Sequence, residues 1–412
     1  MITESENGDT SKWYSKIGGQ LTEGGLSGDT EIMTVRGPVA VSKLSQNDLV
    51  YALDPTTQII KTKPVTAIQT VSGESEVIEI DTKRSNLRVA AKQRIPFQTK
   101  DISTPRIETA ENLREWQYFK FVKEWNRVPR KRVEQFDITR FLDDYEICAT
   151  AEVHGHTFRA SLPDGCEPQW NNSHTGYCFT PTVFEQYQSE IEATADTALI
   201  RGGPNQRGRP YLFDGDDFIA FIGWFVTEGS VYWPPDKNTA QVQIAQEIDS
   251  HRRSIATLLE RMNLDFHSNE RRYEMGSEVF GRLLVSLCGE KSANKRLPEF
   301  VWNLARDQLE LLLEVLLSGD GNDRRTYYTA SERLASDVLR LALELGYKPR
   351  YTRRRGVWQI YIREVFDGVQ PKEHMSRKTT TENLYRLTVA DYSVVMAGRN
   401  GKFQWVGVSN VS

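Results

Sequence analysis

The chain has few cysteines, no long apolar run and no excess of positive charge. None of its 412 residues begins a run of 18 apolar residues, so no segment is expected to cross a membrane as a helix. The N-terminal stretch MITESENGDTSKWYSK is polar and acidic, and it lacks the apolar core of a signal peptide. We therefore expect a cytoplasmic protein that neither enters a membrane nor is secreted.

The four cysteines are too few to form a disulfide scaffold in a chain of this length. Three of them, Cys148, Cys166 and Cys178, share one short window with three of the six histidines. Thiolate sulfur and imidazole nitrogen are the usual ligands of structural Zn²⁺, so this window is a candidate zinc site. It has no CxxC or HxxxH spacing, and buried thiols beside solvated imidazoles are the alternative interpretation.

Charge is nearly balanced over the whole chain, because 52 Lys and Arg residues accompany 56 Asp and Glu residues. The basic residues are nevertheless clustered, for example at residues 127–132 and 350–355. Local fields rather than net charge attract phosphate groups. Each cluster is either a solvated surface or part of a nucleic-acid contact.

The sequence pattern changes several times along the chain, which predicts several domains. Residues 1–24 form a polar tail. Residues 25–125 are rich in short β-branched segments separated by turn residues, and strand-like sequence returns at residues 380–412. This pattern predicts one all-β domain that is interrupted by an insertion. Strands are expected at residues 30–35, 48–53, 65–71, 76–81 and 87–90.

The insertion itself has two parts. Residues 126–210 are irregular and rich in aromatic residues, Pro and Gly, and we interpret them as a linker or a DNA-recognition region. Residues 211–370 contain two copies of one order of elements, in which an apolar helix is followed by strands and an amphipathic helix. The repeat predicts an α+β domain with internal pseudo-twofold symmetry.

Both apolar helices end in an acidic residue followed by glycine, at Glu228-Gly229 and at Asp320-Gly321. The glycines are expected in the left-handed conformation that terminates many helices. If the helices pack side by side, the two carboxylates meet at one end and their repulsion requires a cation. Mg²⁺ held by these carboxylates and by substrate phosphates would suit phosphodiester hydrolysis.

The segments FIGWFVTEG (residues 221–229) and LEVLLSGDG (residues 313–321) resemble the paired LAGLIDADG motifs of homing endonucleases. The resemblance implies a site-specific endonuclease for double-stranded DNA, with Glu228 and Asp320 as catalytic metal ligands. Two motifs in one chain imply a monomer. Two positions depart from the family pattern: Glu228 replaces aspartate, and Val315 stands where glycine would ease helix packing.

The same resemblance implies further site residues. Lys295 precedes the second motif, where such enzymes often carry a basic residue, and it would stabilise charge at the scissile phosphate. A surface lysine at a helix start is the alternative. The hairpin at residues 350–362 would enter the major groove, unless it is merely solvated. Its candidate DNA contacts are Arg350, Arg353, Arg354, Arg355, Trp358 and Gln359, and phosphate contacts would come from Arg127, Arg130, Lys131 and Arg132.

The flanking β segments resemble an intein splicing (Hint) domain, at residues 26–30 (LSGDT), 384–391 (LYRLTVAD) and 397–406 (AGRNGKFQWV). The positions that carry splicing chemistry in that family are degenerate. Gly25 has no nucleophilic side chain, Gln93 replaces the assisting histidine, and Ser409 replaces the histidine before Asn410.

We therefore expect a multidomain protein in which a Hint-like β domain is interrupted by a LAGLIDADG endonuclease domain. The expected function is metal-dependent cleavage of double-stranded DNA by an intein derivative that no longer splices. One alternative is a DNA-binding protein that has lost cleavage. Another is residual self-processing at Asn410 by cyclisation of its side chain.

Overall fold

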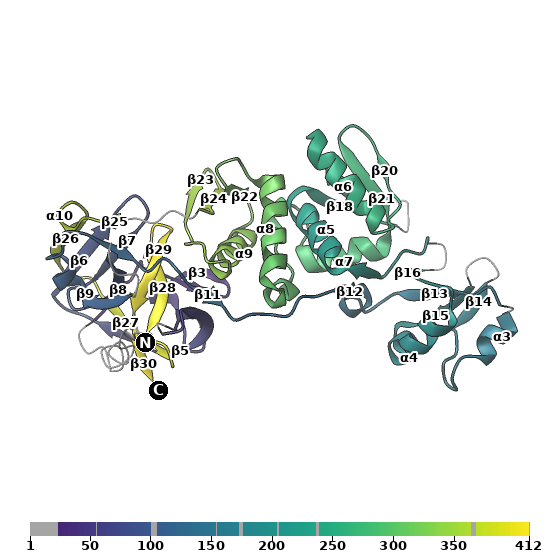
Figure 1. Ribbon diagram of the computed structural model, residues 1–412, viewed down its shortest axis with the longest axis horizontal. Helices are drawn as coiled ribbons and strands as arrows, with labels where there is room; N and C mark the ends of the chain where they lie inside the picture. The colour runs from purple at the N-terminus through teal and green to yellow at the C-terminus, as the bar shows by residue number, and fades with distance from the viewer. Residues whose placement is uncertain are drawn as a thin grey trace, which may run out of the picture. The chain divides into compact units, whose positions relative to one another are not determined.

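A computed structural model describes residues 24–54, 56–99, 105–153, 155–172, 176–203, 206–235, 239–363 and 368–411. The chain falls into two compact units, which Figure 1 draws as ribbons. The first unit combines Met1–Pro129 with Asn322–Ser412, and the second is Arg130–Gly321. The predicted repeat at residues 211–370 is therefore divided between the units. Apart from Gly24, the predicted polar tail lies outside the described residues.

The large sheet of the first unit takes strands from both ends of the chain. Strand β5 (Ile59–Val71) pairs with β4 (Leu49–Leu53) on one side and with β27 (Leu384–Ala390) on the other. Strand β28 (Val394–Arg399) pairs with β2 (Glu31–Thr34) in the same way. The other strands of this sheet are β1 (Leu26–Ser27), β3 (Gly37–Ala40), β6 (Ser75–Asp81), β7 (Asn86–Ala90), β11 (Asn126–Arg127), β26 (Met375–Thr380), β29 (Lys402–Gly407) and β30 (Ser409–Val411).

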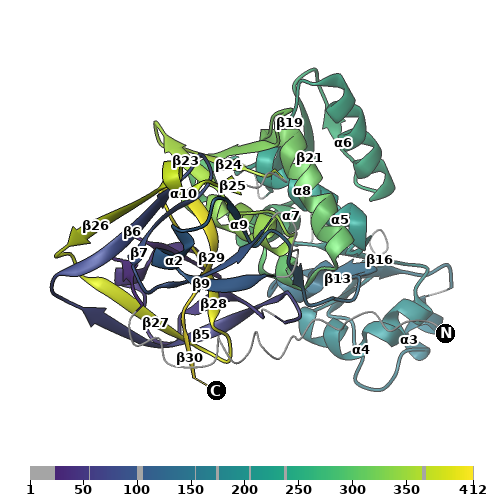
Figure 2. The same cartoon turned by 60° about the vertical axis from the view of Figure 1, so that its left-hand side comes forward.

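The five strands predicted between residues 30 and 90 are confirmed as β2, β4, β5, β6 and β7. Their aliphatic side chains form the core, for example Ile78 and Ile80 on β6 and Val89 on β7. β-Branched residues pack well on a pleated surface, which is why the pattern could be read from the sequence. Figure 2 shows β5, β6, β26 and β27 as long ribbons of this unit.

A smaller sheet and two short helices complete this β region. The sheet consists of β25 (Gly368–Val369), β10 (Phe119–Phe121), β8 (Arg94–Gln98) and β9 (Arg106–Thr109), in that order. The short helices are α2 (Ala110–Leu113) and α10 (Pro371–His374), and the 3₁₀ turn η1 (Val41–Lys43) accompanies them. Phe97 and Phe119 are buried where this sheet joins the core of the large one.

Part of the predicted repeat also belongs to the first unit. Strands β22 (Thr326–Thr329), β24 (Val357–Tyr361) and β23 (Tyr351–Arg354) form a three-stranded sheet beside helix α9 (Glu332–Glu344). The helix is held by a buried network in which the Tyr51 hydroxyl donates to Glu344 Oε1 over 2.5 Å. Arg340 Nε lies 2.6 Å from the Tyr51 hydroxyl, and Arg127 Nη1 lies 3.2 Å from Glu344 Oε2. These contacts bind α9 to β4 and β11, because breaking a buried pair leaves an uncompensated charge.

The second unit contains both motif helices. Helices α5 (Gly215–Glu228) and α8 (Arg306–Asp320) pack against each other, and α6 (Asp249–Arg261) and α7 (Glu278–Cys288) pack on α5. The adjoining sheet has the order β18 (Gly229–Tyr232), β19 (Gln241–Ala245), β21 (Arg272–Gly276) and β20 (His267–Ser268). Short 3₁₀ turns η3 (Ser292–Asn294) and η4 (Glu299–Asn303) lead into α8.

Residues 130–214 are more ordered than the expected linker. They contain a sheet with the order β14 (Trp170–Asn172), β15 (Gly176–Phe179), β13 (Glu146–Thr150) and β16 (Thr197–Arg201). With it lie α3 (Gly155–Ala160), α4 (Pro181–Thr194), η2 (Ile138–Phe141) and the pair β12 (Gln135–Asp137) with β17 (Leu212–Asp214). Strands of three to five residues are too short to display a periodic pattern, which explains why the sequence did not reveal them.

Across the described ranges of both units, no helix combines the length and the apolar composition needed to cross a bilayer.

Candidate active site

The motif helices α5 and α8 approach closely because small residues line their contact. A Cβ built on Gly223 of α5 would lie 2.7 Å from Val315 Cγ1 of α8, so a larger residue at position 223 would clash. The reverse relationship holds further along, where a Cβ on Gly319 of α8 would clash with the Thr227 side chain. Each helix therefore supplies a glycine opposite a branched side chain of the other.

Each helix ends at the predicted acidic residue. Asp214 caps the start of α5 by accepting from the backbone N–H groups of Asp216 and Asp217, and the helix runs to Glu228. Helix α8 runs to Asp320. Because the helices pack side by side and both end at their carboxylate, Glu228 and Asp320 share one end of the pair, as the effect of Glu228 on the ionisation of Asp320 shows.

The glycines after the two acids are not in the predicted left-handed conformation. Gly229 has φ −89° and Gly321 has φ −103°, so both are extended and lead out of the helix. Their role is spatial instead. A Cβ on Gly229 would collide with the carbonyl oxygen of Phe225, and one on Gly321 with that of Leu317. The chain thus needs glycine to leave the last helical turn so sharply.

The two carboxylates repel each other in a partly buried setting. Burial, then the negative charge of Glu228, raises the pKa of Asp320 from 3.8 to about 7, although Lys295 opposes the rise. Burial also raises the pKa of Glu228, against a hydrogen bond from Gln246. Both groups therefore resist ionisation until a positive charge joins them.

Lys295 is buried close to this pair, with only 4% of its surface exposed. Its Nζ donates to the Phe225 carbonyl oxygen over 2.9 Å and lies 3.7 Å from the centre of the Phe225 ring. Burial lowers the pKa of Lys295 to about 8, while Cys288 and Asp320 raise it. Lys295 is therefore not a surface lysine, and its charge interacts with Asp320.

Gln246 is a site residue that sequence reasoning missed. Its Nε2 donates to Glu228 Oε1 over 3.3 Å, and its Oε1 accepts from the backbone N–H groups of Glu247 and Ile248. These bonds fix the amide so that it faces the carboxylate. A polar residue directly after strand β19, which pairs with the strand leaving α5, was the available signal.

The arrangement fits a divalent cation. Carboxylate oxygens are the ligands that Mg²⁺ prefers, and two like charges with raised pKa values gain most from a shared cation. The ends of α5 and α8 carry partial negative charge as well, which adds to the attraction.

The predicted DNA-contact hairpin is β23–β24 of the first unit. Arg353, Arg354 and Arg355 are exposed, and the Arg353 guanidinium stacks 5.1 Å from the Trp358 ring centre. Trp358 itself is buried, with 9% of its surface exposed. The remaining two predicted contacts lie within the sheet: Arg350 stacks on Tyr361, and Gln359 Oε1 accepts from the Thr352 and Tyr361 hydroxyls.

The basic residues at 127–132 have different surroundings. Arg127 is buried in the network with Glu344, so it does not face solvent. Arg132 forms ion pairs with Asp216 and Asp307 at the starts of α5 and α8, where it holds the two helices together. Arg130 and Lys131 are exposed. Only the latter two offer a fully accessible charge to phosphate.

The degenerate splicing positions form a structural connection. The backbone N–H of Gly25 donates to Gln93 Oε1 over 2.9 Å, and Gln93 Nε2 donates to the carbonyl oxygen of Gly407. Gln93 thus links the two ends of the β unit. Ser409 is buried, and Asn410 lies beside Val389 in the pairing of β30 with β27.

The predicted three-cysteine zinc set is not assembled. Among the described residues, the group suited to a metal consists of Glu146, Cys148 and Cys178, without Cys166. Cys166 lies in the turn after α3, whereas the other two cysteines face each other across β13 and β15. The register of those strands, which the sequence could not supply, decides which sulfurs meet.

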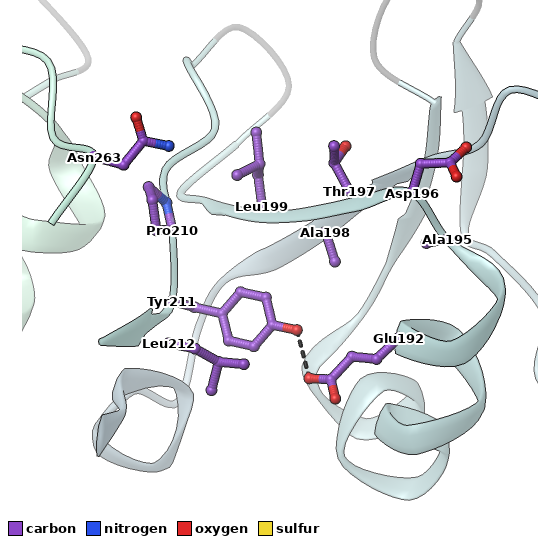
Figure 3. Close-up of a pocket in the computed structure, with 10 residues that line it drawn as sticks. All are labelled: Glu192, Ala195, Asp196, Thr197, Ala198, Leu199, Pro210, Tyr211, Leu212 and Asn263. Carbon is purple, nitrogen blue, oxygen red and sulfur yellow. Dashed lines mark hydrogen bonds between the residues drawn. The ribbon is translucent and has the colours of Figure 1, made fainter. Parts of the chain in front are cut away.

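A cavity of about 430 Å³ lies elsewhere in the second unit, between α4 and the segment leading to β17. Figure 3 shows Tyr211 pointing toward Glu192, with its hydroxyl 2.6 Å from Glu192 Oε1. The residues that line this cavity include none of the predicted site residues. The candidate active site is therefore the shared end of α5 and α8.

No family model matches the chain. The GyrA-type subunit of DNA gyrase from Mycobacterium gordonae is 26% identical over 233 residues, which cover 50% of this chain. The chain spans only 41% of that relative's length. Among solved structures, mesophilic variants of the homing endonuclease I-DmoI are similar to 36% of this chain over 88% of their own, with 15% identity and a TM-score of 0.29. A variant of the Ssp DnaB mini-intein is similar to 27% of this chain over 64% of its own, with 18% identity and a TM-score of 0.20.

Proposed function

We propose that the chain is a site-specific, metal-dependent endonuclease for double-stranded DNA, of the LAGLIDADG type, derived from an intein that has lost protein splicing. One observation carries the proposal. Glu228 and Asp320 end two closely packed helices, and the charge of Glu228 helps raise the pKa of Asp320 to about 7. Such a pair of carboxylates is costly unless it serves to hold a cation.

Glu228 and Asp320 would hold the divalent ion, for which Mg²⁺ is the proposed choice. When bound, the ion supplies Lewis acidity and neutralises charge on the phosphate oxygens. Gln246 fixes one oxygen of Glu228 through its amide, so that the carboxylate keeps its orientation. Lys295 holds a positive charge next to Asp320 in a buried setting, where it would stabilise the charge that develops on a scissile phosphate.

DNA would be bound through exposed basic residues. Arg353, Arg354 and Arg355 on the β23–β24 hairpin offer guanidinium groups that suit guanine or phosphate. Arg350 and Gln359 would join them on the same sheet, while the buried Trp358 supports Arg353 from beneath. Arg130 and Lys131 would add phosphate contacts. The burial of Arg127 and the ion pairs of Arg132 favour structural roles for these two residues.

Both halves of the proposed site come from one chain, so a monomer is sufficient. The loss of splicing follows from chemistry, because Gly25 offers no nucleophile and Gln93 no imidazole. Self-processing at Asn410 is disfavoured for the same reason, since Ser409 provides no imidazole to protonate the leaving amide. It would be visible as a mass change at the C-terminus alone.

The decisive experiment is cleavage of a pool of randomised and genomic DNA by the purified chain in Mg²⁺. Asp320→Asn is the inactive variant, and Glu310→Gln on the exposed face of α8 is the matched control. We expect discrete cuts with the native chain and the control, and none with Asp320→Asn. Binding at low salt without cuts would instead identify a DNA-binding protein that does not cleave.

A further inference from the structure

Two cysteines outside the candidate active site face each other in the small sheet of the second unit. Cys148 on β13 is the direct partner of Cys178 on the antiparallel strand β15, and their Sγ atoms lie 2.6 Å apart. Both side chains are buried, and both thiols are free. Residues directly opposite in an antiparallel pair have Cβ atoms about 4.5–5.5 Å apart, close to the roughly 3.5–4.5 Å of a disulfide. Joining the two sulfurs therefore needs little backbone movement.

A buried arginine lies beside this pair. Arg201 on β16 is the strand partner of Glu146, and its Nε lies 3.0 Å from Glu146 Oε2. Its Nη2 donates to Cys178 Sγ over 3.2 Å, and the side chain is only 1% exposed. A positive charge at that distance favours the thiolate of Cys178. The hydrogen bond to Cys178, with burial, raises the pKa of Cys148, which keeps that partner a thiol.

The same arginine argues against a metal at this place. A cation bound by Glu146, Cys148 and Cys178 would face the guanidinium that already contacts two of these three groups. Like charges in a buried site repel strongly. A disulfide, in contrast, carries no charge and leaves the pair of Arg201 and Glu146 balanced.

We propose that Cys148 and Cys178 are a site of reversible disulfide formation, with hydrogen peroxide as the oxidant. The Cys178 thiolate attacks one peroxide oxygen, which forms a sulfenic acid and releases hydroxide. The Cys148 sulfur then attacks the Cys178 sulfur, forming the S–S bond while the sulfenic oxygen leaves as water. In total, two thiols and one peroxide give one disulfide and two waters. A dithiol reductant reverses the step by thiol–disulfide exchange.

The bond would tie β13 to β15 and close the intervening chain, including α3, into a loop. Closing a loop restricts the unfolded chain, so the oxidised sheet should resist unfolding more than the reduced sheet. The proposal does not depend on DNA cleavage, because none of the three residues belongs to the proposed active site.

The test uses the full chain, reduced and then divided into untreated and peroxide-treated samples. Free thiols are blocked with N-ethylmaleimide after denaturation, and the peptides are identified by mass. Trypsin alone leaves Cys166 and Cys178 on one peptide, so endoproteinase Glu-C is added to cut at Glu167 between them. We expect a cross-linked Cys148–Cys178 peptide only after peroxide, while Cys166 and Cys288 remain blocked in both samples.

Thermal unfolding provides the second readout. The oxidised chain should melt several degrees above the reduced chain, and the difference should vanish in Cys178→Ser but persist in Cys288→Ser. If Cys178→Ser does not fold, the peptide masses of the native chain still decide the question. Four blocked cysteines after peroxide would overturn the proposal. So would protection of both cysteines in the reduced chain together with one equivalent of bound zinc, measured by plasma mass spectrometry.

Discussion

Val315 on α8 packs against the bare backbone of Gly223 on α5. A Cβ at Gly223 would lie 2.7 Å from Val315 Cγ1 and 3.0 Å from Val315 Cβ, so the valine fits only because its partner has no side chain. Considered alone, Val315 departs from the small residue expected at this contact. Considered with Gly223, it is one half of a complementary pair that keeps α5 and α8 in close contact.

This relationship predicts that Gly223→Ala will destabilise the chain by about 1–3 kcal/mol, the usual cost of overpacking a well-packed core. Cleavage should fall as well, because a shift between α5 and α8 moves Glu228 away from Asp320. Urea unfolding measures the first effect and a DNA-cleavage assay the second. The free energy gained from intrinsic helix propensity on replacing Gly by Ala, at most about 1 kcal/mol, opposes the clash but does not cancel it.

The control is the double variant Gly223→Ala with Val315→Ala. Val315→Ala alone leaves a small cavity and should also destabilise the chain. Because the added methyl group fills the vacated space, the double variant should be more stable than the sum of the single effects by about 1 kcal/mol or more. Strict additivity would show that the two residues do not contact each other.

The raised pKa of Asp320 predicts how stability depends on pH without metal. The folded chain binds this proton with a pKa of about 7, whereas the unfolded chain binds it near 3.8. Protonated Asp320 therefore stabilises the fold below about pH 4, and this contribution is lost as the pH rises toward 7. We expect a loss of roughly 1–3 kcal/mol after allowance for solvent screening. Urea unfolding from about pH 4 to about pH 8 measures it, and Asp320→Asn should flatten the curve.

Mg²⁺ should act in the opposite direction along the same pH range. It competes with the proton for Asp320, so its stabilising effect on the melting temperature should be larger at about pH 8 than at about pH 6. Glu310→Gln, which removes an exposed carboxylate on the same helix, should leave this difference unchanged. An equal Mg²⁺ effect at both pH values would contradict an ion held by Asp320.

Gln93 is predicted to stabilise the β unit by joining Gly25 to Gly407. Gln93→Ala should lower the free energy of unfolding by about 1–3 kcal/mol, because a buried N–H and a buried carbonyl lose their partner. DNA cleavage at room temperature should be unaffected, since the second unit contains both proposed metal ligands. Gln46→Ala, at an exposed glutamine of the same unit, is the control. A loss of cleavage with unchanged stability would contradict this structural role.

The sequence was informative where one pattern alone determines the structure. The β-branched segments of residues 30–90 form strands, and the two helices end at Glu228 and Asp320 as predicted. It was uninformative where the outcome depends on contacts between distant segments. Gln246, the pairing of Cys148 with Cys178 and the burial of Arg127 all follow from strand register or tertiary packing. The motif glycines were placed correctly but for the wrong reason, since steric contact with the preceding turn, rather than a positive φ, requires them.

Lys295 allows the electrostatic and the structural role of a buried charge to be separated. Its Nζ donates to the Phe225 carbonyl oxygen, and its charge opposes the rise in the pKa of Asp320. Lys295→Met keeps most of the side-chain volume and removes the charge. We expect the single-turnover cleavage rate at saturating Mg²⁺ to fall by about 10²-fold, the usual loss for one stabilising group. The pH profile of cleavage should also move to higher pH, because Asp320 then ionises less readily.

The matched control is Lys291→Met, at an exposed lysine of the same loop, which should leave both the rate and the pH profile unchanged. If Lys295→Met lowers stability while the rate and the pH profile stay as they were, Lys295 only caps the end of α5 through Phe225. A shift of the pH profile has no explanation in a purely structural role, because a missing helix cap does not change the ionisation of a carboxylate on another helix. The profile, rather than the rate alone, therefore decides whether Lys295 acts on the charge at the site.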